Sequence, residues 1–232
     1  MLRTQGVDQP TDRLAVLLDL AGSGQCLVDV GTDHARLPRD AVRQGRFQRA
    51  IGIDRRPSAL ARGRDTVDRA RLRDRVALHL AEGLASVRPH QADVVVLAGM
   101  GGPTICEILE SVPSGVTRLV VQPNSRVSEV RQVLAGRGWR IDDERLGHQR
   151  GRLFPTMAWV PGPGPGHLTL LDAWFGPVLR RRGGPRFAAY RAALIAHLRT
   201  VAAHEPHSEA ARVLDAVARE AGFGGECHSS SS

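Results

Sequence analysis

Short, continuous apolar runs alternate with amphipathic stretches over the first 160 residues of the chain. Uninterrupted runs rich in β-branched residues are typical of strands buried on both faces of a parallel sheet. They predict strands at 26–30, 49–54, 76–80, 93–98, 118–121, 139–146 and 153–160. The stretches before and between them predict helices at 11–20, 37–45, 55–71, 104–110 and 127–135. This alternation predicts an α/β fold with a doubly wound, Rossmann-like, seven-stranded sheet.

Residues 161–166 alternate proline with glycine and can form neither a helix nor a strand ladder. Beyond them, apolar residues recur at helical spacing and predict helices at 168–179, 187–203 and 208–221. We therefore expect a first domain at 1–160, a helical C-terminal domain at 167–222, and a disordered tail of low complexity at 223–232.

The charge of the chain is strongly basic, with 32 basic and 24 acidic residues and a formal net charge of +8. Every basic residue other than histidine is arginine, whose planar guanidinium suits phosphate contacts. A compositional bias of the genome explains the choice of arginine over lysine equally well. The excess of positive charge itself points to a nucleic acid partner.

The three cysteines, Cys26, Cys106 and Cys227, lie far apart and form no C-x-x-C pair. Neither a disulfide framework nor a metal site is therefore expected. No basic and apolar leader stands at the N-terminus, and no apolar run approaches the length of a membrane span. These features predict a cytoplasmic protein without membrane contact.

The first predicted strand ends at Asp29-x-Gly31, and polar residues then open a helix. The glycine allows a tight turn, and the helix offers free amides and its positive end to a carboxylate or phosphate. Thr32, Asp33 and Ala35 stand where a dinucleotide fingerprint has further glycines, so a loop for S-adenosyl-L-methionine (SAM) fits better. An ordinary strand, turn and helix is the alternative interpretation of this stretch alone.

Candidate binding groups also follow the later strands. Asp54 ends the second strand 23 residues after Gly31, the spacing of an acid that accepts ribose hydroxyls; a helix cap near Pro57 is the alternative. Glu82 follows the third strand, where an acid often meets adenine in SAM enzymes. The fourth strand runs into residues 99–102, which hold more glycines than one turn needs. The fifth strand ends on residues 122–124, whose two amides can read a base edge.

Four motifs stand in a fixed order: DVGTDHARLP at 29–38, AGMGG at 98–102, QPN at 122–124 and FGP at 175–177. With them the chain resembles the bacterial tRNA (adenine-22-N1)-methyltransferase family over roughly residues 11–200. The resemblance implies SAM as methyl donor, a Rossmann-like SAM-dependent methyltransferase sheet, and a C-terminal coiled-coil-like helical domain that helps to hold tRNA. The chain departs from the family pattern at Arg36 (usually Tyr), at Glu82-Gly83 (usually Asp-Gly) and at Phe154-Pro155 (usually Tyr-Glu).

The motifs assign expected roles to individual residues. His34 is equally well explained as a helix-start residue with a local hydrogen bond, and Arg36 either stacks on the base or faces solvent. The expected catalytic residues are Asn124, His34 and Gly101. The expected cofactor-binding residues are Asp29, Gly31, Thr32 and Asp33 at the methionine end, Asp54 and Arg55 at the ribose, Glu82, Gly83 and Leu84 at the adenine, and Ala98, Gly99 and Met100 near the methyl group.

The expected reaction is methyl transfer to N1 of an adenine in tRNA. N1 carries an in-plane lone pair, so the site mainly has to align N1, the methyl carbon and sulfur, and needs no strong base. Methylation of another RNA position or of a small molecule, and tRNA binding without turnover, are the alternatives. We expect tRNA as partner and a monomer or weak homodimer, while the methylated nucleotide and the set of tRNAs stay open.

Overall fold

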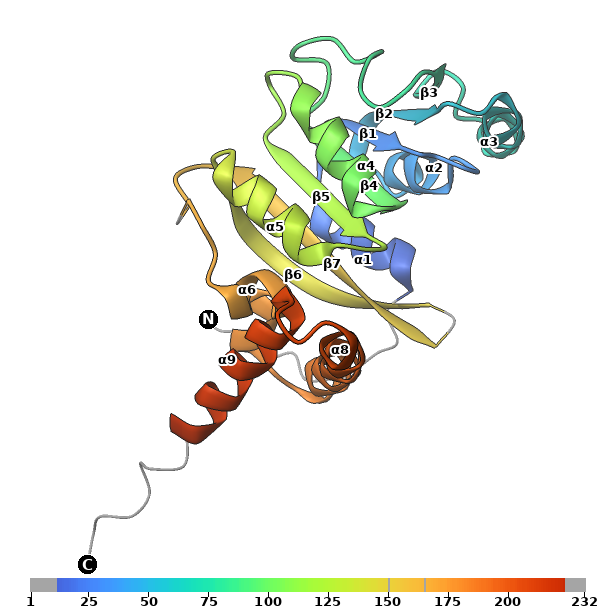
Figure 1. Ribbon diagram of the computed structural model, residues 1–232. Coiled ribbons are helices and arrows are strands. Elements are labelled where there is room, and N and C mark those ends of the chain that lie inside the picture. Colours follow the sequence, from blue (N-terminus) through green and yellow to red (C-terminus); the bar gives the residue numbers. More distant parts are fainter. Residues whose placement is uncertain (1–11, 150, 165, 224–232) are drawn as a thin grey trace, which may run out of the picture.

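The computed structural model describes residues 12–149, 151–164 and 166–223. Its centre is a seven-stranded sheet in the order β3-β2-β1-β4-β5-β7-β6 (Figure 1). The first five strands are parallel, β7 runs antiparallel to β5, and β6 runs antiparallel to β7. The predicted strands are thus confirmed, several of them longer than expected: β1 Gly24–Val30, β2 Phe47–Asp54, β3 Val76–Leu80, β4 Val94–Met100, β5 Arg118–Pro123, β6 Trp139–Gln149 and β7 Arg152–Pro161.

Helices cover both faces of the sheet because successive strand residues point to opposite sides. Val28 belongs to an apolar cluster with residues of the helices that follow β4 and β5, whereas Leu27 belongs to a second cluster with residues of the first three helices. The sheet is therefore the middle layer of three. These helices are α1 Arg13–Ala21, α2 Arg36–Arg43, α3 Pro57–Arg69, α4 Gly102–Ile108 with the 3-10 turn η1 Leu109–Ser111, and α5 Val127–Gly136.

The carboxyl ends of the parallel strands meet at one edge of the sheet. Val30 of β1 pairs with Ile53 of β2 on one side and with Leu97 of β4 on the other. The chain winds outward in opposite directions from β1 and β4, which makes the gap between them the switch point where α/β sheets bind ligands. The loops after β1, β2 and β4 are thereby brought together.

The C-terminal helices gather at the β6 end of the sheet, opposite β3 (Figure 1). They have an apolar cluster of their own around Phe175, Leu198 and Val213. α9 reaches Phe223, one residue into the predicted tail, and the rest of that tail lies outside the described residues, as does Thr11. The four elements are α6 Leu170–Phe175, α7 Pro177–Arg182, α8 Pro185–His204 and α9 Glu209–Phe223.

The prediction of one helix over 168–179 is wrong, because the chain breaks at Gly176 into α6 and α7. Gly176 has a φ of 86°, in the left-handed region that favours glycine. A Cβ at this position would lie 2.6 Å from a carboxylate oxygen of Glu144, so only glycine fits there. Pro177 follows, and it starts α7 without an amide to donate.

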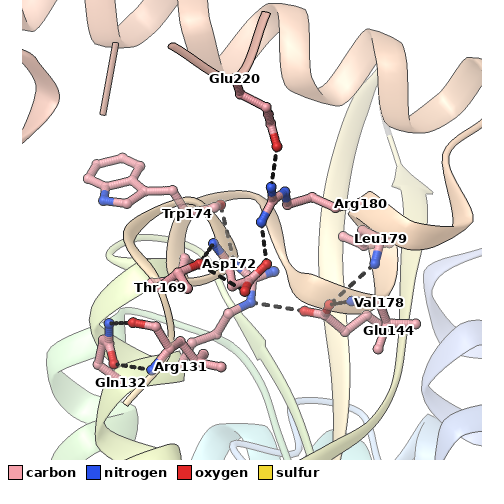
Figure 2. A network of polar contacts seen from close by, with 12 residues as sticks. Arg131, Gln132, Glu144, Thr169, Asp172, Trp174, Val178, Leu179, Arg180 and Glu220 are labelled. Atoms are coloured by element: carbon pink, nitrogen blue, oxygen red, sulfur yellow. Dashed lines mark hydrogen bonds and ion pairs between the residues drawn. The ribbon is translucent and has the colours of Figure 1, made fainter. Parts of the chain in front are cut away.

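A buried ion pair joins the sheet domain to these helices (Figure 2). Arg131 of α5 and Glu144 of β6 are both fully buried, and Arg131 Nε lies 2.9 Å from Glu144 Oε1. Arg131 Nη1 also donates to the carbonyl of Ala173 in α6 at 2.8 Å. Glu144 Oε2 accepts from the backbone amide of Val178 in α7 at 2.9 Å. The pair thus holds the end of α6 and the start of α7 on the sheet.

Candidate functional site

A cavity of about 630 Å³ opens at the carboxyl edge of the sheet, beside the ends of β1, β2 and β4. Its volume lies within the range of small-molecule and cofactor sites. The loops after the strands supply one side, and α4 supplies the other. The lining residues are Val30, Gly31, Ile53, Asp54, Arg55, Arg56, Ala81, Glu82, Gly83, Leu84, Ala85, Ala98, Gly99, Met100, Thr104, Glu107, Ile108 and Ser111.

Most of the expected cofactor-binding residues line this cavity, although they come from four separate loops. Those that do are Gly31, Asp54, Arg55, Glu82, Gly83, Leu84, Ala98, Gly99 and Met100. Those that lie outside the cavity wall are Asp29, Thr32 and Asp33, together with the expected catalytic residues Asn124, His34 and Gly101. These expected residues from the ends of four strands therefore meet at one cavity, whereas the expected catalytic residues lie outside its wall.

Asp54 sits in the wall with its carboxylate held in place. Its side chain is 4% exposed, and Oδ1 accepts the backbone amide of Arg56 at 2.8 Å. The guanidinium of Arg56 also grips the carboxylate, with Nε 3.1 Å from Oδ1 and Nη2 3.2 Å from Oδ2. Asp54 is not the N-cap of α3, as the helix-cap alternative requires, because the N-cap residue is Arg56, directly before Pro57. A fixed carboxylate at the cavity wall can accept hydroxyl groups of a ligand.

Asp29 lies beneath the loop after β1 and is 9% exposed. Burial raises the pKa of this carboxyl to about 7, against the opposing charge of Arg13. The loop above it is tied to β2, because the amides of Gly31 and Thr32 both donate to the carbonyl of Ile53, at 2.8 and 2.9 Å. Asp29 is thus a buried acid outside the cavity wall, next in the chain to Val30, which lines the cavity.

Asp33 and His34 form a surface cluster rather than part of the cavity wall. Asp33 pairs with Arg62 and, at 3.6 Å, with Arg56, and the hydrogen bond from Arg62 is the main reason that its pKa is lowered. His34 Nε2 lies 3.2 Å from Asp33 Oδ2, and both side chains are close to half exposed. This geometry agrees with the interpretation of His34 as a helix-start residue with a local partner.

The carboxyl end of β4 is held from the β5 side by Asn124. Its Nδ2 donates to the carbonyl of Gly99 at 2.7 Å, and its backbone amide donates to the carbonyl of Met100 at 2.9 Å. Gln122 in turn donates to Asn124 Oδ1 at 3.3 Å. The side-chain amide expected to read a base is therefore engaged in shaping the loop that forms the cavity wall.

Three glycines lie where β4 runs into α4, at positions 99, 101 and 102, and their surroundings differ. Gly99 has a φ of 81°, and a Cβ there would lie 2.6 Å from Nη2 of Arg13. At Gly102 a Cβ would lie 2.6 Å from the backbone oxygen of Ser125, so close packing of α4 requires glycine. At Gly101 nothing lies nearer than 3.5 Å. Packing therefore does not require glycine at position 101.

Several site residues escaped the sequence reasoning. Arg56 follows an acid that draws attention first, and α4 contributes Thr104, Glu107 and Ile108 without any motif to mark them. Arg13 reaches Gly99 from α1, a contact between residues far apart in the chain. Only the three-dimensional arrangement reveals these contributions.

Other kinds of site find little support in the described ranges. Within them, no group of three or more His, Cys, Asp or Glu side chains is placed to hold a metal ion. Over the same residues, no helix combines the length and apolar character needed to cross a membrane.

Known proteins resemble the chain in both sequence and structure. A family model described as "Methyltransferase domain" matches residues 11–157. The tRNA (adenine(22)-N(1))-methyltransferase of Bacillus subtilis (strain 168) is 27% identical over 153 residues, which make up 65% of this chain and 64% of that protein. The chain thus spans just under two thirds of the length of this curated relative.

Solved structures extend the likeness to the C-terminal helices. The crystal structure of Streptococcus pneumoniae Sp1610 in complex with S-adenosyl-L-methionine superposes with a TM-score of 0.75 at 29% identity, over 82% of this chain and 89% of that one. The structure of the Bacillus subtilis m1A22 tRNA methyltransferase has a TM-score of 0.77 at 22% identity, over 90% of this chain and 94% of that chain, and shares the fold.

Proposed function

This chain belongs to the methyltransferase domain family, and on that premise we propose that it transfers the methyl group of SAM to N1 of an adenine in tRNA, of the position-22 type. The observation that carries the proposal is the cavity at the switch point, where Gly31, Asp54, Glu82 and Gly99 converge from four loops. A SAM-bound structure with the same fold and 29% identity supports the choice of cofactor. The curated relative in Bacillus subtilis supports the choice of substrate.

In the proposed binding mode, the ribose of SAM lies at Asp54 and its adenine lies toward Glu82. Asp54, fixed by Arg56, is placed to accept the two ribose hydroxyls. Glu82 and the α4 residues Thr104 and Ile108 lie on the side where adenine would pack. Gly31 and Asp29 lie on the side of β1, where the methionine end would follow. SAM, when bound, supplies the electrophilic methyl group.

In this proposal, the target base approaches the methyl group beside residues 99–102, where β4 runs into α4. N1 of adenine attacks through its own lone pair, so alignment is the main demand and contributes about 7–11 kcal/mol when it is good. Asn124 serves this alignment indirectly, because it fixes the carbonyl of Gly99. Gly101 leaves the approach open, since no atom lies within 3.5 Å of a Cβ placed there.

The tRNA surface that we propose includes the C-terminal helices. Arg180 and Arg182, two of the arginines there, are engaged within the protein, with Asp172 and Asp143 respectively. Arg181 and Arg199 have exposed side chains that can meet phosphates. The target adenine must leave its stack to reach the cavity, which costs a few kcal/mol.

The cytoplasm is the proposed location of this activity, and a monomer or weak homodimer is the proposed state. Gel filtration with light scattering at two protein concentrations tests the second point. A stable tetramer would contradict it.

Methyl transfer to unmodified tRNA tests the proposed function. The full-length protein is incubated with transcribed tRNA and SAM that carries an isotopically labelled methyl group, and the digested nucleosides are analysed by mass spectrometry. We expect the label in 1-methyladenosine. Asp54→Asn should lose most of this activity, whereas Asp68→Asn, which removes a surface carboxylate outside the cavity wall, should keep it. Label in another nucleoside would support a different RNA position, and no label in RNA would contradict the proposal.

A further inference from the structure

A second cavity, of about 240 Å³, lies where the C-terminal helices meet β6. Its volume is below the range of sites that hold a whole cofactor, so it suits one small group of a larger ligand. Three arginines contribute to its wall: Arg145 from β6, Arg182 from the end of α7 and Arg186 from the start of α8. Among the described residues that line it, none is acidic. The second cavity therefore favours an anionic group.

Two of these arginines are held in place by a shared carboxylate. Asp143 Oδ1 accepts from Nη2 of Arg182 at 2.7 Å, and its Oδ2 accepts from Nε of Arg145 at 3.1 Å. Arg182 Nη1 also donates to the carbonyl of Glu144, and Asp19 lies 3.5 Å from Arg145 Nη1. Both arginine side chains stay about half exposed. A guanidinium has five N–H donors, so these contacts orient the two side chains and leave donors for a ligand.

The rest of the wall fits a phosphate that is attached to a sugar or base. Guanidinium groups bind phosphate oxygens through paired, parallel donors. Phe187 packs against the apolar cluster of the C-terminal helices and also lines the second cavity. An apolar surface thus lies beside the arginines, as a nucleotide requires. Because the arginines from β6 and α7 are oriented before binding, less side-chain entropy is lost when a ligand arrives.

The second cavity lies at the same edge of the sheet as the proposed methyl site. β6 runs in the same direction as β4, and the pairing across β7 and β5 places Glu144 level with Leu97. Arg145, the next residue, is therefore level with the end of β4 that lines the first cavity. Neighbouring strands are about 4.8 Å apart, so the three steps from β4 to β6 span about 14 Å. One folded tRNA can reach both places.

We propose that the second cavity is a subsite for one backbone phosphate of tRNA, away from the target adenine. Arg145, Arg182 and Arg186 bind the phosphate oxygens, and Phe187 packs against the attached ribose. The inference rests on the proposed function, since it takes tRNA as the substrate. A free nucleotide presents the same phosphate chemistry and is the alternative source of this ligand.

A salt series of tRNA binding to the full-length protein tests the subsite. Each phosphate contact contributes about 0.9 to the slope of log K against log salt concentration on a duplex. Arg145→Gln/Arg186→Gln should therefore make the slope shallower by about 1 and weaken tRNA binding by about 10-fold or more at low salt. The KM for tRNA should rise with little change in kcat, and the affinity for S-adenosylhomocysteine should stay the same.

Arg64→Gln/Arg69→Gln is the matched control, because it removes the same charge from two exposed positions of α3, at the β3 end of the sheet. It should leave the salt slope close to that of the wild type. Arg145→Lys/Arg186→Lys keeps the charge but not the paired donors, so it should keep the slope and lose affinity several-fold. If the Gln variant fails to fold, this Lys variant decides, and wild-type affinity in it would overturn the inference.

The remaining outcomes are separable. Weaker tRNA binding with an unchanged salt slope would assign the arginines to support of the turn between α7 and α8, and would overturn the inference. An equal change of slope in the α3 control would show an effect of net charge alone and overturn it too.

Calorimetry with ATP, on protein saturated with S-adenosylhomocysteine, tests the free nucleotide. We expect no binding; binding that disappears in the Gln variant would assign the second cavity to a free nucleotide and overturn the tRNA subsite. A wild-type protein that binds no tRNA would overturn the proposed function and this inference with it. A wild-type protein that methylates tRNA, with the same salt slope as the Gln variant, would overturn this inference alone.

Discussion

Removal of one partner from the buried pair of Arg131 and Glu144 should destabilise the protein severely. Glu144→Leu leaves the Arg131 guanidinium, with no exposed surface, without its carboxylate, and it leaves the amide of Val178 without its acceptor. Stranding one charge of a buried pair costs about 3–5 kcal/mol. That is a large part of the total stability of a domain, which is about 5–15 kcal/mol.

The double variant Arg131→Met/Glu144→Leu removes both charges and distinguishes the cost of a stranded charge from general damage. What remains is the unpaired amide of Val178 and the carbonyl of Ala173, each worth about 1–3 kcal/mol when left unsatisfied. We therefore expect the double variant to lose about 2–6 kcal/mol, less than the sum of the two single variants, which is about 6–10 kcal/mol. Such non-additivity is the signature of a coupled pair.

Urea unfolding followed by circular dichroism measures these differences. Arg73→Met is a matched control, because Arg73 pairs with Asp68 on the surface and is 75% exposed, so its loss should leave the urea midpoint close to that of the wild type. The single variants should also weaken tRNA binding as the C-terminal helices loosen, with unchanged affinity for S-adenosylhomocysteine. Two results would contradict this prediction: a Glu144→Leu variant as stable as Arg73→Met, or a double variant that loses as much stability as the two single variants together.

Four further predictions concern the site. Asp54→Ala should weaken SAM binding by about 1.5–3 kcal/mol in calorimetry, and unchanged affinity would remove Asp54 from the ribose. Gly101→Val should bind SAM normally yet fail to methylate tRNA, because packing has room for its Cβ; normal turnover would make the loop a mere turn. Because burial raises the pKa of Asp29 to about 7, the folded state binds an extra proton between about pH 4 and 7, so this group lowers stability as pH rises through that window. Urea titrations should show a flatter pH dependence for Asp29→Asn, and an identical slope would contradict the assignment. Replacing Arg181 and Arg199 by Gln should weaken tRNA binding and make its salt dependence shallower in filter binding, whereas an unchanged slope would place the phosphates elsewhere.

The strands of the fold were predictable because buried parallel strands carry their signal locally, as uninterrupted apolar runs. The convergence of Asp54 and Gly99 followed from topology, since parallel strands end at one edge of the sheet. The break at Gly176 was not predicted, because its cause is the carboxylate of Glu144, which β6 brings from elsewhere in the chain.

The sequence predicted most of the residues that line the cavity, but the residues expected to be catalytic lie outside its wall. His34 and Asp33 belong to the motif DVGTDHARLP, yet neither lines the cavity: Asp33 pairs with arginines of α3 and its start, and His34 lies against Asp33. Arg13 has no motif around it, and its place beside Gly99 depends on how α1 packs against the sheet. Local patterns identify the loops of a site, whereas long-range packing decides which side chains enter it.

The proposed activity is methylation of one adenine of tRNA at N1. Two tRNA transcripts that differ only at position 22, one with adenine and one with guanine, test it most directly when each is incubated with the full-length protein and labelled SAM. We expect labelled 1-methyladenosine at position 22 of the transcript with adenine and no labelled nucleoside in the transcript with guanine. Equal labelling of both transcripts, or label in neither, would contradict it.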